Sequence, residues 1–339
     1  MKLCWPDLFA RFRPRTGWIQ VEVTSHCNAA CVYCPHTVYR ETWQSRHLPL
    51  ATFQTLLPTL ARKSLAYLQG WGEPLLHPDF FSMAALAKKA GCRVGATTNG
   101  MLLDARRIQQ ILEVDLDILA FSLAGVDESQ DGIRCGTSFQ RVLDHIKALC
   151  QAKARAGRSR PQINLAYLVF RSKVAELERL PQVFSGLGIE EVVINTLDFI
   201  PTRELAAESF HGANPAEQEE LLECLETLLG AGGREGLKIA CQPLRFGERN
   251  LLCPENVQQS LCVAANGAVS PCVFTNLPIS AGTYWAQGRA RPYRPLTFGN
   301  IHDQSVQTIW RQREYKNFRR SFFTGKLATP CQHCLKLKN

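Results

Sequence analysis

The stretch His26-Cys-Asn-Ala-Ala-Cys-Val-Tyr-Cys-Pro35 places three cysteines, Cys27, Cys31 and Cys34, at the spacing C-x3-C-x2-C. It follows a short apolar run that is typical of a buried β-strand. Three thiolates this close, with no fourth cysteine nearby in the sequence, can hold an iron or zinc centre with one open coordination position. Because an open position is where a metal centre performs chemistry, the stretch indicates a catalyst rather than a scaffold.

The triplet has two other interpretations. The cysteines lie at positions i, i+4 and i+7, so on a helix they would form an ordinary buried stripe. The segment is short and polar for a core helix, however, and Pro35 ends it. The second alternative is a zinc site with His26 or His36 as the fourth ligand. Structural zinc sites usually use paired C-x2-C units, and only one such unit is present here, so an iron–sulfur cluster is favoured.

Three more motifs follow in order, each at or just after the end of a candidate strand: G-W-G-E-P at 70–74, T-T-N-G at 97–100 and F-S-L-A-G at 121–125. Together with the triplet and its aromatic Tyr33, they resemble the motif series of the radical S-adenosylmethionine (SAM) enzymes. The resemblance covers the chain from about residue 17 to its C-terminus. It implies a [4Fe–4S] cluster on the three cysteines, with SAM bound at the fourth iron. It also implies cleavage of SAM to a 5′-deoxyadenosyl radical that abstracts hydrogen from a substrate.

The resemblance further implies which residues meet SAM. Gly72 and Glu73 would meet the methionine end, where glycine permits a close backbone approach. Trp71 stands where small residues are common in the family, so a local difference in this turn is expected. Arg134 would pair with the methionine carboxylate, and a surface arginine is the alternative. For the glycine turn, the alternative is a plain β–α turn with no role in binding. The other implied contacts are Tyr33 with the adenine, Thr98 and Asn99 beneath the cofactor, and Ser122 with the ribose. No residue is singled out as catalytic.

Short β-rich runs alternate with helical patterns between residues 17 and 197. Six strand–helix units in series predict a parallel sheet with its helices outside, which right-handed crossovers curl toward a barrel. The expected fold class is therefore α/β, and the resemblance implies an open, partial (β/α)6 TIM-type barrel with a small C-terminal domain. Barrels of this class perform chemistry at the carboxyl ends of the strands, where the motifs fall. The predicted strands are Trp18–Thr24, Leu65–Gln69, Arg93–Thr98, Ile118–Leu123, Ile163–Phe170 and Glu191–Thr196. The predicted helices are Leu50–Arg62, Asp79–Ala90, Asp104–Glu113, Phe139–Ala156, Val174–Leu187 and Asn214–Leu229, with Asp104 and Ser138 as N-caps.

Five further cysteines gather in the last ninety residues, around a predicted hairpin whose turn is Asn266-Gly267. This region resembles the SPASM or twitch extension of radical SAM enzymes, which carries auxiliary clusters. The resemblance implies one auxiliary [4Fe–4S] cluster on Cys253, Cys272, Cys331 and Cys334, because too few cysteines remain for a second. Cys262 sits within a strand, where packing explains it, yet it is the first substitute for Cys253. A zinc ion held by four thiolates is the alternative. The expected domains are an N-terminal extension at 1–16, a radical SAM core at 17–235 and an auxiliary-cluster domain at 236–339.

The composition fits a globular protein. The chain has 339 residues, of which 20% are charged, and no run of 18 apolar residues that would span a membrane. Its first residues lack the apolar core of a signal peptide, and its 14 cysteines in a chain of this size suggest metal binding, so a cytoplasmic location is expected. The net charge of +9 is spread over the sequence, which disfavours nucleic-acid binding. An acidic partner, such as a ferredoxin- or flavodoxin-like electron donor, fits this charge.

The sequence favours a radical SAM enzyme that oxidises or matures a peptide, protein or cofactor precursor. An auxiliary cluster beside the active cavity can take the substrate electron, which suits an oxidation. Polar residues after the sixth strand, Asp198, Arg203 and His211, are candidates for substrate contact by position, with a surface role as the alternative. The other functions considered are a small-molecule radical dehydrogenase and a non-catalytic iron–sulfur or zinc protein. An electron carrier usually closes every iron with cysteine, and the three-cysteine site argues against it.

Overall fold

The computed structural model of the chain describes residues 17–232, 237–241 and 251–337. The predicted N-terminal extension at 1–16 lies outside these residues, and so does the predicted domain boundary at 235. No helix in the described part of the chain combines the length and the apolar character needed to cross a membrane.

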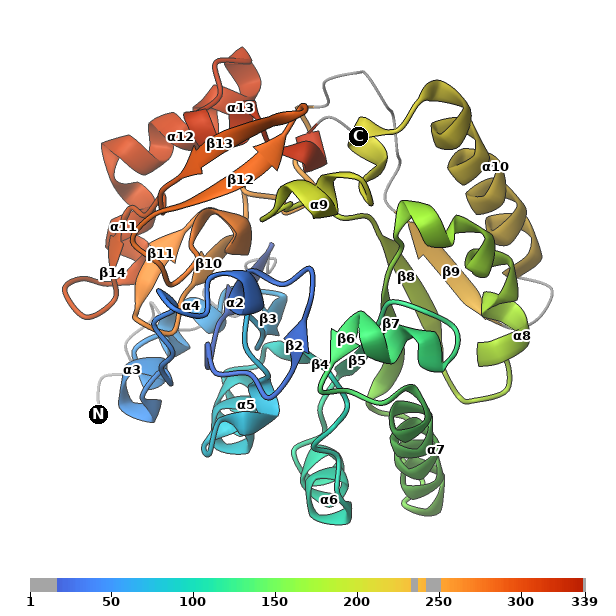
Figure 1. Cartoon of the computed structure of the whole chain (residues 1–339). Helices are drawn as coiled ribbons and strands as arrows, with labels where there is room; N and C mark the ends of the chain where they lie inside the picture. Colours follow the sequence, from blue (N-terminus) through green and yellow to red (C-terminus); the bar gives the residue numbers. More distant parts are fainter. Residues whose placement is uncertain (1–16, 233–236, 242–250, 338–339) are drawn as a thin grey trace, which may run out of the picture.

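The six predicted strands are present and lie side by side in chain order, each parallel to the next. Most of their residues are buried, and Figure 1 shows helices along the outside of the curved sheet. One more strand, β9 (Lys238–Cys241), pairs in parallel with the last of them. The predicted α/β fold with a partial barrel is confirmed. The six strands are β1 (Trp18–Val21), β3 (Leu65–Tyr67), β4 (Arg93–Thr98), β5 (Ile118–Leu123), β7 (Gln162–Leu168) and β8 (Glu191–Asn195).

The C-terminal region extends the same sheet beyond β1. Strand β10 (Leu261–Val263) pairs in parallel with β1, and β11 (Ala268–Ser270) returns antiparallel to β10. The predicted Asn266-Gly267 turn joins them, and Gly267 takes the left-handed φ of +82° that favours glycine. Strand β14 (Gly299–Asn300) completes a ten-stranded sheet in the order β14-β11-β10-β1-β3-β4-β5-β7-β8-β9. Two short ladders stand apart: β2 (Ala30–Cys31) with β6 (Arg134–Cys135), and β12 (Gly282–Ala286) with β13 (Arg289–Tyr293).

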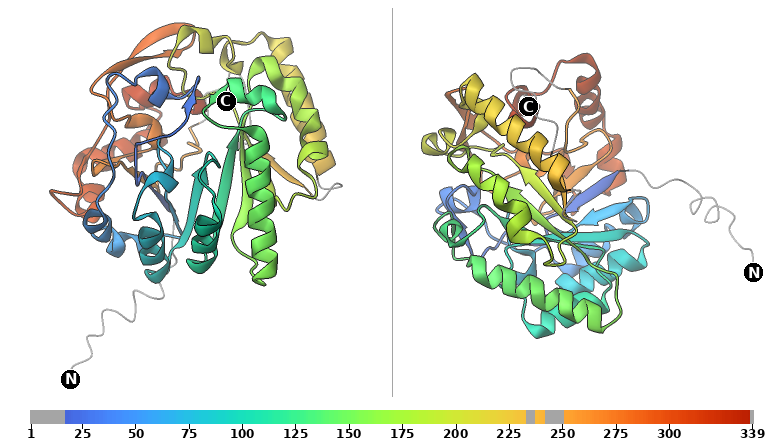
Figure 2. Two further views of the ribbon diagram at one scale, coloured as in Figure 1. Left: turned by 60° about the horizontal axis from the view of Figure 1, so that its bottom comes forward. Right: turned by 90° about the vertical axis from the view of Figure 1, so that its right-hand side faces the viewer.

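The longer helices lie on the outside of the sheet, as both views in Figure 2 show. Asp104 and Ser138 are the N-caps that the sequence predicts, and their side chains accept bonds from the amides of Arg107 (2.8 Å) and Arg141 (3.4 Å). These helices are α5 (Phe80–Lys89), α6 (Ala105–Glu113), α7 (Phe139–Arg155) and α10 (Pro215–Gly232). The C-terminal region adds α11 (Val306–Arg311), α12 (Arg313–Thr324) and α13 (Thr329–Gln332). Shorter elements are α2 (Pro35–Val38), α9 (Arg203–Ala206), η1 (Pro74–Leu76), η2 (Glu128–Gly132), η4 (Phe210–Gly212), η5 (Val273–Thr275) and η6 (Leu335–Leu337).

Two predicted helices are each divided in two. The predicted helix at 50–62 is α3 (Leu50–Gln54) followed by α4 (Leu57–Leu60). Pro58 explains the division, because its ring clashes with the carbonyl four residues earlier, and α3 ends at that residue. The predicted helix at 174–187 is the 3₁₀ segment η3 (Arg171–Arg179) followed by α8 (Leu180–Phe184), with Pro181 in the first turn of α8.

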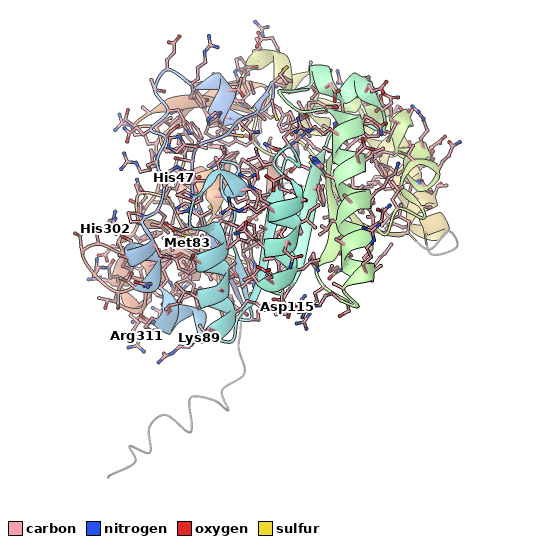
Figure 3. All side chains as sticks on the ribbon, turned by 90° about the horizontal axis from the view of Figure 1, so that it is seen from below. His47, Met83, Lys89, Asp115, His302 and Arg311 are labelled. Atoms are coloured by element: carbon pink, nitrogen blue, oxygen red, sulfur yellow. The ribbon has the colours of Figure 1, made fainter. Side chains whose placement is uncertain are left out.

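Ion pairs hold the amino-terminal ends of the strands. Asp117, directly before β5, is buried and accepts bonds from the Val94 amide (2.8 Å) and from Lys88 Nζ (2.8 Å). Arg160 lies 3.3 Å from the other oxygen of the same carboxylate. Figure 3 shows the neighbouring Asp115 at the lower end of the helices. This charge network lies at the end of the strands opposite the carboxyl ends, where barrels of this class perform chemistry.

Candidate functional site

The cysteine triplet lies just beyond the carboxyl end of β1. Cys31 belongs to β2 and Cys34 caps α2, while a bond from the Cys34 amide to the Cys31 carbonyl (3.0 Å) tightens the turn between them. The sulfur of Cys27 accepts a bond from the Ala29 amide (3.5 Å). Burial raises the pKa of Cys27 to about 11 and that of Cys34 to about 12. At neutral pH these thiols therefore stay protonated, and the binding of a metal cation would release their protons.

Arg134 is paired with Cys31 across the β2–β6 ladder. It is only 4% exposed, so the alternative of a surface arginine is wrong. Its guanidinium donates to the hydroxyl of Tyr33, and its Nε is buried without a hydrogen-bond partner among the described residues. A buried guanidinium with a free N–H is suited to an anionic ligand such as a carboxylate.

A cavity at the carboxyl ends of the strands, which we call the strand-end cavity, opens beside this pair. Cys34, Tyr33 and Arg134 form one side of it. Ser122 of β5 and Leu168 of β7 belong to its wall, as do residues 195–199 at and after the end of β8. The predicted contacts Tyr33, Ser122 and Arg134 are thus brought together around one space.

Glu73, Thr98 and Asn99 are also brought together, but by bonds to one another. The Glu73 carboxylate is 2% exposed and accepts bonds from the Thr98 hydroxyl (2.8 Å) and the Asn99 amide (2.7 Å). The Asn99 side chain donates to that of Asn28, within the triplet (2.8 Å). These bonds join the ends of β3 and β4 to the cysteine loop, which makes Glu73 an organiser of the site. Direct contact of these three residues with SAM stays a prediction.

Gly72 is required by the protein's own backbone. A Cβ at this position would lie 2.4 Å from the Thr24 carbonyl oxygen and 2.5 Å from that of His26. The adjoining Glu73 amide donates to the same His26 carbonyl (2.8 Å). The glycine turn is therefore packed against the segment that leads into Cys27, which is more than a plain β–α turn requires.

Glu22 is a buried residue that the sequence analysis missed. It is 2% exposed, and its two oxygens accept bonds from the Trp71 amide (2.9 Å) and the Ala265 amide (3.1 Å). Burial raises its pKa to about 7, against the opposing effect of these two amides. Gly70 makes room for it, since a Cβ there would lie 2.2 Å from the Glu22 Cγ. Glu22 thus joins β1, the glycine turn and the C-terminal hairpin.

Trp71 links the same turn to the C-terminal region. Its indole Nε1 donates to the carbonyl of Val273 (3.1 Å), the residue after Cys272. Its ring packs against Phe274 and Phe199, with centroids 5.7 and 6.1 Å apart. The predicted local difference at this position has a physical origin, because the large side chain fills the contact between the two cysteine-bearing regions.

The four predicted auxiliary ligands surround a second space, which we call the C-terminal cysteine cavity. Cys253 lies in the loop before β10, Cys272 follows β11, and the other two belong to the last turns of the chain. Burial raises the pKa of Cys253, Cys272 and Cys334 to about 12, and that of Cys331 still further. Cys262 is instead buried within β10, opposite Gln20 of β1.

Among the residues that the structure describes, no group of three Cys, His, Asp or Glu side chains is arranged to hold a single metal ion. Thiolates around zinc all lie about 2.3 Å from one point, whereas a cubane spreads its ligands more widely. The predicted zinc alternatives for the triplet are further weakened because His26 packs on His47 (4.6 Å between centroids) and His36 on Trp43 (5.2 Å).

Comparison with known families gives two matches. Residues 21–159 match the model of the radical SAM superfamily, and residues 253–335 match the SPASM model of an iron–sulfur cluster-binding domain. The first match contains the triplet and the glycine turn, and the second contains all four C-terminal cysteines named above.

Three curated proteins resemble nearly the whole chain. The tungsten-containing aldehyde ferredoxin oxidoreductase cofactor-modifying protein of Pyrococcus furiosus is 23% identical, over 94% of this chain and 86% of its own length. The AdoMet-dependent heme synthase of Methanosarcina barkeri is 25% identical, over 92% and 86%. The PqqA peptide cyclase of Gluconobacter oxydans is 24% identical, over 92% and 81%.

Among solved structures, Streptococcus suis SuiB bound to SAM has a TM-score of 0.67 at 12% identity, covering 95% of this chain and 71% of SuiB. This likeness concerns the fold, and it agrees with the partial barrel and C-terminal region described above. The chain therefore belongs to the radical SAM superfamily and carries a SPASM iron–sulfur domain, which makes it an enzyme that uses a [4Fe–4S] cluster, SAM and auxiliary iron–sulfur chemistry.

Proposed function

We propose that Cys27, Cys31 and Cys34 hold the cluster that binds SAM. Their thiols lie together at the strand ends, with Cys34 in the wall of the strand-end cavity. Three protein ligands leave one iron free, and SAM bound there supplies, on one-electron reduction, the 5′-deoxyadenosyl radical that abstracts hydrogen. The fit with a cubane is supported by the donor set, which is three thiols on one short loop with Cys31 buried and the other two partly buried.

The protein's own residues would bind and orient SAM in this cavity. Arg134 would pair with the methionine carboxylate through its free Nε, and Tyr33 would hold that guanidinium in place while its ring meets the adenine. Ser122 would reach the ribose from the end of β5. Gly72 and Glu73 would offer the turn backbone to the methionine end, and Thr98 and Asn99 would fix that turn through their bonds to Glu73.

One auxiliary [4Fe–4S] cluster would be held by Cys253, Cys272, Cys331 and Cys334. All four line a single cavity, and Cys262 lies within the β10–β1 pairing. The observation that carries the proposed function is a wall that this cavity shares with the strand-end cavity. Both cavities are lined by Asp198, Phe199, Phe274 and Lys336.

Because the two cavities share a wall, a substrate bound at the strand ends would lie beside the auxiliary cluster. This arrangement suits an oxidation of a peptide, protein or cofactor precursor. It is also consistent with the functions that the names of the three relatives state, which are cofactor modification, heme synthesis and peptide cyclisation. The electron donor would be a ferredoxin- or flavodoxin-like protein, in keeping with the net charge of +9. A cytoplasmic location fits the thirteen described cysteines, since no disulfide joins any two of them.

The test begins with the anaerobic, reconstituted full chain. Iron analysis should give about eight irons per chain, as two cubanes require. Reduction with added SAM should yield 5′-deoxyadenosine, and serine at Cys27 should abolish it. Serine at Cys331 should halve the iron and leave SAM cleavage in place, whereas Cys262→Ser should keep the full iron content. Four irons with one zinc, or no 5′-deoxyadenosine from a fully loaded chain, would refute the proposal.

A further inference from the structure

A buried ion network occupies the wall that the two cavities share. Lys336 Nζ lies 2.8 Å from Glu255 Oε1 and 3.4 Å from Asp198 Oδ2. The three side chains are only 7%, 14% and 7% exposed, respectively. Asp198 also accepts a bond from the Thr196 hydroxyl (2.9 Å) and faces His211, whose Nε2 lies 3.9 Å from its Oδ1. The network is therefore held from several elements and has little contact with water.

This network is placed next to the predicted auxiliary ligands. Lys336 follows Cys334 by two residues, and Glu255 follows Cys253 by two residues. Lys336, Glu255 and Asp198 line the C-terminal cysteine cavity together with all four of its cysteines. Lys336 also lies over the ring of Phe274, 5.0 Å from its centroid. A cation and two carboxylates thus form part of the surface that would enclose the auxiliary cluster.

A lysine at this position has a cost that packing alone does not explain. Lys336 lies within ion-pair distance of both Glu255 and Asp198, and these two carboxylates keep its side chain charged. Removing charges from water is unfavourable even when they are paired, and apolar residues often replace such networks without loss of stability. Next to a redox centre, however, the same charges have a function, because net charge and nearby dipoles set the reduction potential of an iron–sulfur cluster.

We propose that Lys336, opposed by Asp198 and Glu255, sets the reduction potential of the auxiliary cluster. This inference rests on the proposed function, because it requires that the four C-terminal cysteines hold a cluster. Reduction adds one negative charge to that cluster. The ammonium group stabilises the reduced form and raises the potential, while each carboxylate destabilises the reduced form and lowers it. Lys336 is a positioning residue in this account, since it acts on the cluster through its charge.

The experiment is a potentiometric titration followed by electron paramagnetic resonance on the anaerobic, reconstituted full chain. Lys336→Met removes the cation and should lower the midpoint potential of the auxiliary cluster. A tenfold decrease in the ratio of reduced to oxidised cluster at a fixed potential corresponds to a shift of about 59 mV for a one-electron couple. Asp198→Asn and Glu255→Gln each remove an anion and should shift the midpoint upward. The midpoint potential of Lys336→Arg should stay near that of the wild type, because the positive charge is kept. Lys153→Met is the matched control: it removes a lysine of α7 that is also in an ion pair, and it should leave the midpoint potential unchanged.

The opposite signs of these shifts separate the proposal from a structural role, because loosened packing would move all the variants in one direction. A common direction, or no shift in chains with full iron content, would overturn the inference and leave the proposed function intact. A wild-type chain with a single cluster would overturn the ligand assignment as well. If Lys336→Met fails to load its cluster, the upward shifts of Asp198→Asn and Glu255→Gln still decide the question.

Discussion

Replacing Glu22 with glutamine should remove a pH-dependent loss of stability. The pKa of Glu22 is about 7 in the folded chain, against an ordinary value of 4.5, because the carboxyl group is buried. The folded state therefore holds the proton more tightly than the unfolded state. Below pH 4.5 both states are protonated and Glu22 causes no loss of stability. As the pH rises from 4.5 to 7, only the unfolded chain releases the proton, and the free energy of unfolding falls; above pH 7 the loss is complete.

The size of this effect follows from the shift. About 2.5 pKa units correspond to about 3 kcal/mol, of which roughly 2.5 kcal/mol accumulates between pH 5 and pH 8. Glutamine has the same shape but a single carbonyl oxygen, so it can serve the Trp71 amide or the Ala265 amide. The variant therefore loses one of the two hydrogen bonds, and the cost of that lost bond is the same at every pH. Only the wild type loses stability at this position as the pH rises, so the unfolding free energy of Glu22→Gln should increase relative to that of the wild type from pH 5 to pH 8.

Denaturant unfolding followed by tryptophan fluorescence at pH 5, 6, 7 and 8 would measure this difference. Glu219→Gln, at an exposed position on α10, is the matched control, and its difference from wild type should not depend on pH. Taking the difference between chains cancels the titration of all other groups. A pH-independent difference for Glu22→Gln would show that the carboxyl group ionises in the folded chain as readily as in water, and would refute the reasoning.

Two further substitutions test the triplet's surroundings. Gly72→Ala would place its Cβ 2.4 Å from the Thr24 carbonyl oxygen, so the segment before Cys27 must move. We expect a loss of about 1–3 kcal/mol in stability and less iron at the first cluster, measured by denaturation and iron analysis. Gly230→Ala, within α10 and with nothing within 4 Å, should lose neither stability nor iron. Arg134→Met should weaken SAM binding about 10–150-fold, the equivalent of a charged hydrogen bond of 1.5–3 kcal/mol, in anaerobic calorimetry on cluster-loaded protein. Unchanged SAM affinity in Arg134→Met with full iron content would exclude the predicted carboxylate contact.

The parts of the fold with a local signal could be predicted from the sequence. Apolar runs marked the six strands, because parallel strands are buried on both faces. Side-chain oxygens marked the helix starts at Asp104 and Ser138, and Asn266-Gly267 marked the hairpin. The two divided helices had a signal as well, in Pro58 and Pro181, but helical periodicity outweighed it in the prediction. Each proline removes a backbone donor and clashes with the preceding turn, which periodicity does not measure.

The parts of the site that depend on distant pairings could not be predicted. Glu22 stands in an apolar run like any polar strand residue, and its partners are the amides of residues 71 and 265. Lys336 and Asp198 are 138 residues apart in the chain and meet only in the folded molecule. The position of Asp198 after the sixth strand suggested a substrate contact at most, and the sequence analysis did not single out Lys336. The sequence contained no pattern that would pair them.

Trp71 shows why the two cysteine groups are best understood together. A small residue at this position would keep the backbone bond to Glu22 but lose the contacts of the indole with the C-terminal region. Here the indole donates to the Val273 carbonyl and packs on Phe199 and Phe274, while its amide is bound by Glu22. The turn that would meet SAM is thus connected, through one side chain, to the loop that carries Cys272. The same two regions are also joined within the central sheet, because β10 pairs in parallel with β1. A shift at either cysteine group is therefore resisted by contacts at the other, so the distance between the two proposed clusters is a property of the core and not of a flexible junction between domains.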